Sequence, residues 1–234
     1  MRFSYSQHML QTFPNRVSGI IALDQVRSDV DVTKPIAQYC DVAYERLKQA
    51  SEGEFPEIKA WRKAFSTMGL KPTQYRCASE ALLRRFRKEG NLPNIHPLID
   101  LCNAVSIAFG IPIAVFDSDQ IEGDLMVRQA EGAETYLTFS GDSEHPEPDE
   151  VIFADTAGNA HARRWANRQS RRSAMSGNTT RALIVAEALH DTAEQDVLRL
   201  VAALSESLED TFGAKLTTAL LLEPDAAFDL VSEG

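Results

Sequence analysis

Arginine is concentrated in one short stretch of this 234-residue chain. The segment from Ala162 to Arg172 reads ARRWANRQSRR and combines five arginines with a tryptophan and two side-chain amides. Guanidinium groups bind phosphate through several N–H donors, and an aromatic ring beside them offers a surface on which a base can stack. The same pattern is also typical of a solvated strand edge that charge protects from unwanted pairing. A phosphate-binding surface and a protected strand edge therefore both remain open interpretations.

A second group of ionisable side chains lies in a polar segment between two apolar stretches. Asp117, Asp119, Glu122 and Asp124 are close enough in sequence to raise the hypothesis of a cation site. Their spacing does not match an EF-hand loop, and carboxylates commonly form turns and helix caps. We therefore interpret these four residues as turn-forming.

The familiar catalytic motifs are absent from the sequence. There is no GxxxxGK[ST] phosphate loop, no GxGxxG after a strand, no HExxH and no GxSxG. The five histidines are scattered without the spacing of metal ligands. We expect neither a metal nor a cofactor.

The residues from 92 to 128 form the longest stretch in which all local signals agree. Pro97 suits the first turn of a helix, apolar residues follow at helical spacing, and Gly110 suits a left-handed cap. Residues 111–116 are apolar and partly β-branched, which predicts a buried strand, and residues 125–128 alternate as a second strand. This segment is expected to be the core unit on which the rest of the chain packs.

The remaining sequence predicts further helices and strands, and the expected fold class is mixed α/β (α+β), a layered sheet-and-helix module with a C-terminal helix packed on it. Helices are expected over 34–50, 56–69, 78–89 and 192–213, and strands over 17–23, 135–139, 151–154, 160–165 and 216–222. Residues 181–189 fit a helix or a strand by periodicity alone, and their short length and flanking turns favour a strand. Residues 1–16 show no clear period and are expected to be a loose lead-in, with a single domain over 17–234. The C-terminal helix, for which Thr192 and Gln195 suggest a capping box, either mediates a homodimer or covers the sheet.

Composition is that of an ordinary globular protein, with 44% apolar and 25% charged residues. No apolar run approaches the length of a membrane span, and the N-terminus lacks the apolar region of a secretory signal. Cys40, Cys77 and Cys102 are widely spaced and odd in number, which favours reduced thiols over a disulfide framework or a zinc site. We expect a cytoplasmic protein that does not associate with membranes.

The net charge of -10 is distributed unevenly along the chain. From Glu187 onward there are 11 acidic residues against two basic ones, which leaves 23 acids and 22 bases in the first 186 residues. The acidity is therefore a property of the C-terminal segment. An acidic protein is not a general nucleic-acid binder, but a local basic surface remains compatible with this charge.

Several segments of the chain resemble a known family. The stretch PLIDLCNAVSIAFGIPIAVFDSDQIEGD resembles the pattern VDxTNYVxxELGQPLHAFDxDKIxG, which belongs to the B3/B4 domain of the bacterial phenylalanyl-tRNA synthetase β subunit. The segments VRQAEGAETYLTFSG and EVIFADTAGNAHARRWANRQSRRS follow in the same order and spacing. The preceding WRKAFSTMGLKPTQYRCASEALLRRFRKEGNLP resembles the free-standing B3/4-domain proteins still more. The resemblance runs from Val17 to Leu189 and leaves no room for the catalytic or anticodon-reading modules of a synthetase.

The resemblance implies a fold of layered sheets and helices and a site related to editing, the hydrolysis of tyrosine wrongly joined to the tRNA for phenylalanine. The Asn of the motif, which lines that site, matches Asn103, while its Thr becomes Cys102 and its His becomes Ala114. The Gly-Gly step of a family loop falls near Ala166 and Asn167. The departures at Ala114 and at this loop weaken the case for tyrosine recognition but leave the pocket.

A Glu in an "LLEA" strand of the family pattern falls at Ala186 in strict register and at Glu187 after a shift of one residue. A one-residue slip in a strand moves the side chain to the other face of the sheet. The alignment alone therefore leaves both positions open.

Ester hydrolysis of an aminoacyl-tRNA needs a placed water, donors for the developing oxyanion and a pocket for the side chain, and the ribose hydroxyl of the substrate can assist. The residues that the resemblance and the polar patterns point to are Asn103 and Glu187 for catalysis, Tyr75, Arg76, Asp117, Trp165 and Asn167 for substrate binding, and Arg163, Arg164, Arg168, Arg171 and Arg172 for RNA contact.

Two hypotheses follow, and both have tRNA or aminoacyl-tRNA as an expected partner. The first is a free-standing editing factor that hydrolyses a mischarged aminoacyl-tRNA ester. The second is a non-catalytic module that binds tRNA or RNA ends, an amino acid or a nucleotide. Glu187 or Asp117 pointing into the pocket beside Asn103 would favour the first, and a pocket with only Asn103 and arginines would favour the second.

Overall fold

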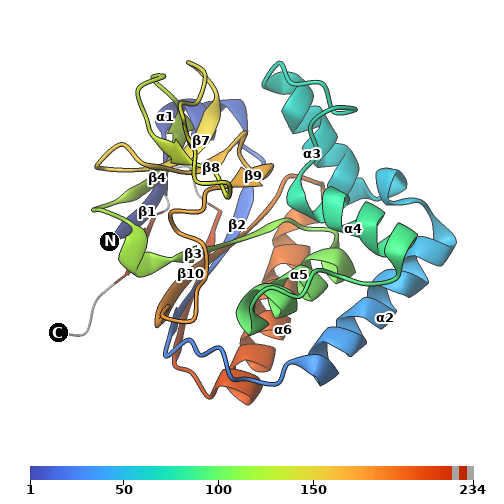
Figure 1. The fold of residues 1–234 in the computed structure, drawn as a ribbon. Coiled ribbons are helices and arrows are strands. Elements are labelled where there is room, and N and C mark those ends of the chain that lie inside the picture. The colour runs from blue at the N-terminus through green and yellow to red at the C-terminus, as the bar shows by residue number, and fades with distance from the viewer. Residues whose placement is uncertain (223–226, 231–234) are drawn as a thin grey trace.

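A computed structural model describes residues 1–222 and 227–230, which form two larger sheets and a set of helices (Figure 1). The helices are α1 (Gln7–Thr12), α2 (Thr33–Gln49), α3 (Pro56–Thr67), α4 (Ala78–Glu89), α5 (Pro97–Phe109) and α6 (Ala193–Phe212), with short 3-10 turns at Glu52–Glu54 and Ser118–Gln120. One sheet has the order β12 (Phe228–Asp229), β1 (Arg2–Tyr5), β4 (Leu125–Gln129), β7 (Val151–Asp155), β8 (Ala160–Arg163) and β9 (Arg168–Gln169). The other has the order β11 (Leu216–Leu221), β2 (Val17–Asp24), β10 (Arg181–Ala188) and β3 (Ile113–Asp117), and β5 (Tyr136–Leu137) pairs with β6 (Ser143–Glu144).

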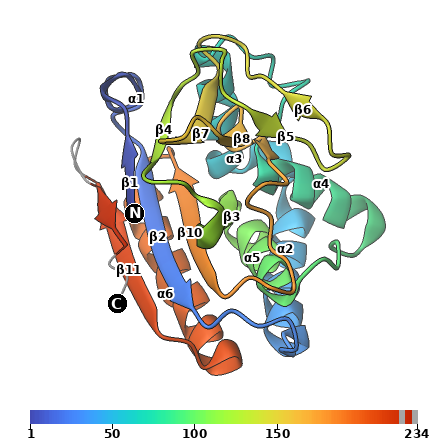
Figure 2. The ribbon, with the colours of Figure 1, turned by 60° about the vertical axis from the view of Figure 1, so that its left-hand side comes forward.

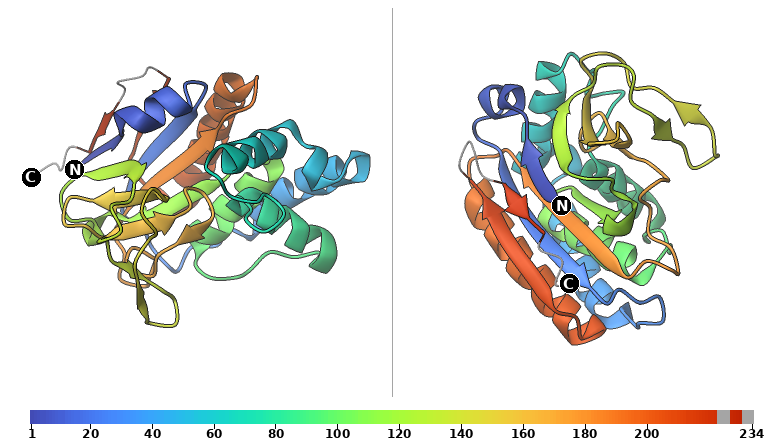
Figure 3. Two further views of the ribbon diagram at one scale, coloured as in Figure 1. Left: turned by 90° about the horizontal axis from the view of Figure 1, so that it is seen from above. Right: turned by 90° about the vertical axis from the view of Figure 1, so that its left-hand side faces the viewer.

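The four-stranded sheet is the middle layer of the molecule. Because side chains alternate along a strand, β10 sends Leu183 and Val185 into one buried cluster and Ile184 and Ala186 into another. The first cluster includes side chains of the six-stranded sheet, and the second includes the apolar faces of α5 and α6. Figures 2 and 3 show α6 lying against β11 and β2, on the side of the sheet away from β1. The mixed α/β class with layered sheets and helices is confirmed.

The core unit expected over residues 92–128 is confirmed, with one addition. Pro97 begins α5, and Gly110 ends it with a φ of 71°. The two strands that follow belong to different sheets, since β3 pairs with β10 and β4 pairs with β1 and β7. The polar corner between them therefore carries the chain from one sheet to the other.

The expectation of a loose lead-in over residues 1–16 is wrong. Arg2–Tyr5 forms β1, which pairs with β4 on one side and with β12 on the other, and α1 follows directly. Phe3 and Tyr5 are buried, whereas Arg2 is exposed. Four residues are too short for a strand period to stand out in the sequence.

Several predicted boundaries also shift. The strand expected over 135–139 shrinks to β5, and the strand expected over 160–165 ends at Arg163. Thr192 is the N-cap of α6, but its side chain accepts no hydrogen bond from the helix backbone and its hydroxyl donates to Asp196, so the predicted capping box is absent. Residues 223–226 and 231–234, which the predicted domain includes, lie outside the described residues.

Helix α6 covers the sheet, as one of the two interpretations of the C-terminal helix proposed. Its apolar stripe is buried in the cluster beneath the four-stranded sheet. A Cβ on Gly19 of β2 would lie 2.4 Å from Val201 Cγ2 and 2.7 Å from Val197 Cγ1, so the helix sits directly on the strand backbone. The apolar face of α6 is thus covered by the sheet, and the homodimer stays a prediction.

A buried polar network fastens the turn between β7 and β8 to the segment after β9. Asp155 accepts hydrogen bonds from the backbone N–H and the side chain of Asn159, and His161 Nε2 lies 3.1 Å from its Oδ2. His161 Nδ1 lies 2.9 Å from Ser173 Oγ. The order of Asp, His and Ser matches that of a hydrolase triad, but His161 and Ser173 have no exposed surface, so no substrate reaches the hydroxyl. The network is structural.

The three cysteines are free thiols. Cys77 and Cys102 are buried, and burial raises the pKa of Cys77 to about 11, which makes it a poor nucleophile at neutral pH. Within residues 1–222 and 227–230, no helix combines the length and the apolar character needed to cross a bilayer.

We expect Gly19→Ala to destabilise the fold by about 1–3 kcal/mol, because the added methyl overlaps two valine side chains of α6. Thermal unfolding measures this as a fall in Tm. Gly177→Ala is the matched control, since a Cβ there meets open space. Equal Tm values for the two variants would contradict the close approach of α6 to β2.

We expect Asp155→Ala to cost on the order of 3 kcal/mol at neutral pH, because it leaves several buried donors without an acceptor. Burial opposes ionisation of this carboxyl, but hydrogen bonds from His161 and Asn159 outweigh it and hold the pKa of Asp155 well below its usual range. Its contribution is therefore present at neutral pH and is lost as the pH falls below about 4. The Tm gap between wild type and variant should narrow on acidification, and the exposed Asp29→Ala should show no such gap.

Candidate functional site

A small cavity of about 60 Å³ lies where β10, β3 and the turn from β8 to β9 meet. Its walls are mostly apolar, and its polar members come from β10 and from the arginine-rich segment. The lining residues are Ala78, Pro112, Ile113, Ala114, Phe153, Ala162, Trp165, Ala166, Asn167, Arg168, Gln169, Val185 and Glu187. Within the described lining, Glu187 is the only carboxylate.

The register of β10 decides which of the two candidate positions carries the carboxyl. Glu187 pairs with Ser18 of β2 and lines the cavity, on the same face of the strand as Val185. Ala186 lies on the opposite face, in the cluster under α5 and α6. The shifted alignment, with the acid at Glu187, is the one that places a carboxyl at the cavity.

Glu187 is 3% exposed and is held by two side-chain donors on one oxygen. Tyr5 Oη donates to its Oε1 at 2.5 Å, and Trp165 Nε1 donates to the same atom at 2.9 Å. Oε2 accepts no hydrogen bond from the part of the chain that the structure describes. That second oxygen is free to accept a bond from water or from a ligand.

Burial raises the pKa of Glu187 above its ordinary value. The two donors and the charge of Arg16 act in the opposite direction without cancelling the effect of burial. The Arg16 guanidinium stacks on the Tyr5 ring at 3.8 Å and donates to Ser18, which in turn lies 2.7 Å from the Tyr5 hydroxyl. A carboxyl with a raised pKa is a stronger base than an exposed one.

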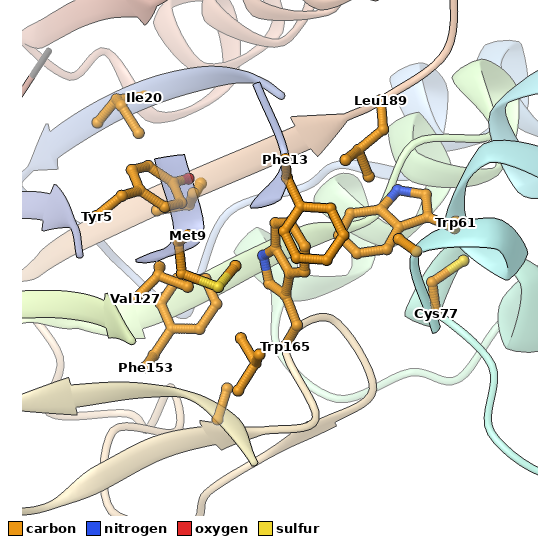
Figure 4. Packing of buried hydrophobic residues seen from close by; sticks show 14 of the residues in the cluster. Tyr5, Met9, Phe13, Ile20, Trp61, Cys77, Val127, Phe153, Trp165 and Leu189 are labelled. Atoms are coloured by element: carbon orange, nitrogen blue, oxygen red, sulfur yellow. The ribbon is translucent and has the colours of Figure 1, made fainter. Parts of the chain in front are cut away.

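Trp165 is held in place by an uncommon backbone conformation and by ring contacts. Arg164 and Trp165 have φ values of 49° and 56°, in the left-handed region that costs a non-glycine residue about 1 kcal/mol or more. The Trp165 N–H donates to Val151 O at 2.8 Å. Its indole ring makes edge contacts with Phe13 and Trp61, each with ring centroids 4.8 Å apart (Figure 4). These contacts offset the strain and fix one wall of the cavity.

Two side-chain amides of the lining have fixed orientations. Asn167 Nδ2 donates to Arg76 O at 2.7 Å, and Gln169 Nε2 donates to Val115 O at 2.5 Å. A carbonyl partner requires the NH₂ end of each amide, so the carbonyl oxygens of Asn167 and Gln169 remain as acceptors.

The structure brings together some of the residues predicted from the sequence. Glu187, Trp165, Asn167 and Arg168 line the cavity. Asn103 does not line it, since this residue is half-buried on α5 between the buried Cys102 and Ala104. The two predicted catalytic residues, Asn103 and Glu187, therefore do not line the same cavity.

The other predicted binding residues lie outside the lining. Arg76 reaches it through its backbone carbonyl, which holds Asn167, and Tyr75 lies under the Arg164 guanidinium at 4.8 Å from the ring centre. Asp117 is 5% exposed and accepts bonds from the Asp119 N–H and the Thr179 hydroxyl. Asp117 thus serves the corner after β3, as the turn interpretation of the acidic group expects.

Most of the predicted RNA-binding arginines are paired with acids of this chain. Arg163 is 5% exposed and bonds Glu150 through Nε and Nη2 and Glu144 through Nη1. The remaining pairs are Arg164 with Glu150 at 3.9 Å, Arg168 with Glu144 at 3.0 Å and Arg172 with Glu122 at 2.5 Å. Arg171 is exposed and has no acidic partner among the residues that the structure describes.

Tyr5 and Gln169 belong to the site but were not predicted from the sequence. Tyr5 was hidden in the segment expected to be a loose lead-in, although the alternation of Phe3 and Tyr5 is a weak strand signal. Gln169 sits inside the arginine-rich run, where the charges dominate the pattern. Across residues 1–222 and 227–230, no three His, Cys, Asp or Glu side chains gather in a geometry that would hold a metal ion.

Bacterial synthetase subunits are similar to this chain in sequence. The phenylalanine–tRNA ligase β subunit of Tropheryma whipplei is 28% identical over 102 residues, which cover 44% of this chain and 10% of that protein. The corresponding subunit of Pectobacterium atrosepticum is 27% identical over 147 residues, which cover 61% of this chain and 18% of that protein. The chain thus spans less than a fifth of the length of these relatives.

The fold is similar to a crystal structure of an N-terminal fragment of the phenylalanyl-tRNA synthetase β subunit from Pyrococcus horikoshii, with a TM-score of 0.49 and 11% identity over 92% of this chain and 49% of that one. The model of the B3/4 domain matches residues 60–208, well over half of the chain and the part that carries Trp165, Asn167 and Glu187. The chain therefore belongs to the B3/4 domain family.

Proposed function

We propose that this protein hydrolyses the aminoacyl ester of a mischarged tRNA, acting in trans. The observation that supports the proposal most is the Glu187 carboxyl, which lines the cavity, has one oxygen without a protein donor and has a pKa raised by burial. The relatives are named as ligases that join phenylalanine to tRNA. An aminoacyl ester on tRNA is therefore the substrate class that the family membership favours.

The proposed step uses Glu187 as the group that orients and deprotonates water. Water bonded to Oε2 attacks the ester carbonyl carbon and gives its proton to the carboxylate. The bond between the carbonyl carbon and the ribose oxygen then breaks, and the proton passes to that oxygen. The products are a free amino acid and a tRNA with an intact terminal hydroxyl, and the neighbouring ribose hydroxyl of the substrate can donate to the developing oxyanion.

A non-catalytic binding module remains the second candidate. Its specific support is that Asn103 does not line the cavity, so the residue carried over from the family motif is not beside Glu187. In such a module, the Glu187 carboxylate and the amide oxygens of Asn167 and Gln169 would bind an amino group or a hydroxyl of a ligand without catalysing a reaction.

We expect Glu187→Gln to lower the deacylation rate by about 100-fold or more, because the amide cannot take a proton from water. The assay mixes protein with a panel of correctly and wrongly charged tRNAs and follows release of the amino acid. Because Glu187 is needed as a carboxylate, the rate should fall as the pH drops through its pKa, which lies above the ordinary 4.5. Spontaneous ester hydrolysis is subtracted at each pH.

The Tm of Glu187→Gln shows whether its loss of deacylation comes from the missing carboxylate or from misfolding. A carboxyl whose pKa is raised in the folded state destabilises the fold as the pH rises above its unfolded pKa, so Glu187→Gln should have a Tm at pH 7 at or above that of wild type. Glu206→Gln, at an exposed position of α6, is the matched control. Full activity in Glu187→Gln would refute the catalytic role assigned to Glu187. If wild-type protein binds charged tRNA but releases no amino acid, the result supports the non-catalytic binding module instead.

We expect Arg171→Ala to weaken tRNA binding without lowering Tm, since this guanidinium is exposed and free of acidic partners in the described chain. Loss of one phosphate contact should reduce the slope of log affinity against log salt by about one. Arg163→Ala should instead lower Tm, because it removes the three hydrogen bonds that this buried guanidinium donates to Glu144 and Glu150. Salt-dependent tRNA binding together with thermal unfolding tests both, and an unchanged slope in Arg171→Ala would remove this residue from the RNA contact.

A further inference from the structure

The Glu187 cavity is small relative to the side chains of aromatic amino acids. Its volume is about 60 Å³, whereas a cavity of roughly 150 Å³ is known to take up benzene. Four of its lining residues are alanines, namely Ala78, Ala114, Ala162 and Ala166, and its two aromatic lining residues are Phe153 and Trp165. The room that remains suits a methyl, hydroxymethyl or thiomethyl group.

The largest wall of the cavity cannot easily withdraw. Trp165 has no exposed surface, and its ring packs against Phe13 and Trp61. Its Nε1 donates to the same oxygen of Glu187 that Tyr5 also binds. Moving the indole to admit an aromatic ring would therefore break this hydrogen bond and the ring contacts together, in a core that is packed like a crystal.

The opposite wall is equally fixed. Phe153 stacks on Phe3 with ring centroids 6.1 Å apart and makes a tilted contact with Phe116 at 5.3 Å. The backbone carbonyl of Glu187 accepts a hydrogen bond from Trp61 Nε1 at 3.2 Å, which holds the end of β10 against α3. The size of the cavity is thus set by buried groups on both sheets.

The polar members of the lining suit the amino end of a small aminoacyl group. Glu187 Oε2 and the amide oxygens of Asn167 and Gln169 are acceptors without a protein donor among the described residues. Arg168 also lines the cavity, but its guanidinium pairs with Glu144 and is not the cation that acts on Glu187. The ammonium group of a small aminoacyl ester would bind the amide acceptors, and its short side chain would contact the apolar lining.

We propose that the cavity selects aminoacyl esters of small amino acids, namely glycine, alanine, serine and cysteine, and excludes those of phenylalanine and tyrosine. This selection rests on the proposed function and names its substrate class. The rings of Trp165 and Phe153 act as a size filter. The amide oxygens of Asn167 and Gln169 accept hydrogen bonds from the amino group, and Glu187 Oε2 stays available for the attacking water.

The test charges one tRNA transcript with alanine, serine, valine, phenylalanine or tyrosine by an aminoacylating ribozyme, so that only the side chain differs. Alanyl and seryl esters should be hydrolysed at least about 100-fold faster than phenylalanyl and tyrosyl esters. Equal or faster hydrolysis of an aromatic ester would overturn the size filter. Hydrolysis of none of the five would instead count against the proposed function.

A binding measurement keeps the size filter testable in that case. Stable 3′-amide analogues of alanyl-adenosine and tyrosyl-adenosine are titrated into the protein by calorimetry. Tighter binding of the alanyl analogue supports the filter even where no ester is cleaved, and equal or tighter binding of the tyrosyl analogue overturns it.

Two variants alter the cavity in opposite directions. Ala114→Val reduces the cavity and should lower hydrolysis of alanyl and seryl esters at least tenfold, while Ala219→Val on β11, away from the cavity, should not. Trp165→Leu enlarges it and should raise the relative rate on phenylalanyl ester at least tenfold. If Trp165→Leu fails to fold, the Ala114→Val variant and the binding of the two analogues still test the size filter. An unchanged rate of alanyl and seryl ester hydrolysis in a folded Ala114→Val variant would contradict the proposal.

Discussion

The site depends on the burial of a single carboxyl group. Removing a carboxylate from water costs several kcal/mol, and hydrogen bonds to a charged acceptor return about 1.5–3 kcal/mol each. Glu187 receives such bonds from Tyr5 on β1 and Trp165 on the turn after β8, while Trp61 of α3 binds its backbone carbonyl. The six-stranded sheet, the four-stranded sheet and the helical layer therefore meet at this one residue, and the cavity exists because all three are held there.

Part of this arrangement lies outside the segment that the family model matches. The match covers residues 60–208, whereas Tyr5, Phe13 and Arg16 come from the N-terminal strand and helix region. Tyr5 supplies one of the two donors to Glu187, and Phe13 supplies one of the two rings that pack on Trp165. The N-terminal segment thus completes the wall of the cavity, so the shape of the site is a property of this whole chain and not of the family segment alone.

Elements with local, repeated signals could be predicted from the sequence. Pro97 and Gly110 delimit α5 as predicted, and the short length and flanking turns of residues 181–189 correctly favoured a strand for β10, where periodicity alone left helix and strand open. Prediction failed for β1, which is only four residues long. The sequence also did not reveal that Arg163, Arg164 and Arg168 pair with Glu144 and Glu150, because these acids are distant in sequence from the arginine-rich run. The register of Glu187 could not be read from the alignment either, because a shift of one residue changes the face and only strand pairing fixes it.

The distribution of charge around the cavity leaves Glu187 unneutralised. Arg163, Arg164 and Arg168 pair with Glu144 and Glu150, so these arginines do not pair with the Glu187 carboxyl. The cation that lowers the pKa of Glu187 is Arg16, which contacts Tyr5 and Ser18 and not the carboxylate itself. Glu187 therefore keeps an oxygen with unused acceptor capacity inside an apolar wall. Such a group attracts a positive or proton-donating partner more strongly than an exposed carboxylate does, because water screens the interaction less in a mostly apolar cavity. Asp155, by contrast, has hydrogen bonds on both carboxyl oxygens and does not line the Glu187 cavity, and this contrast supports the choice of Glu187 as the candidate site residue.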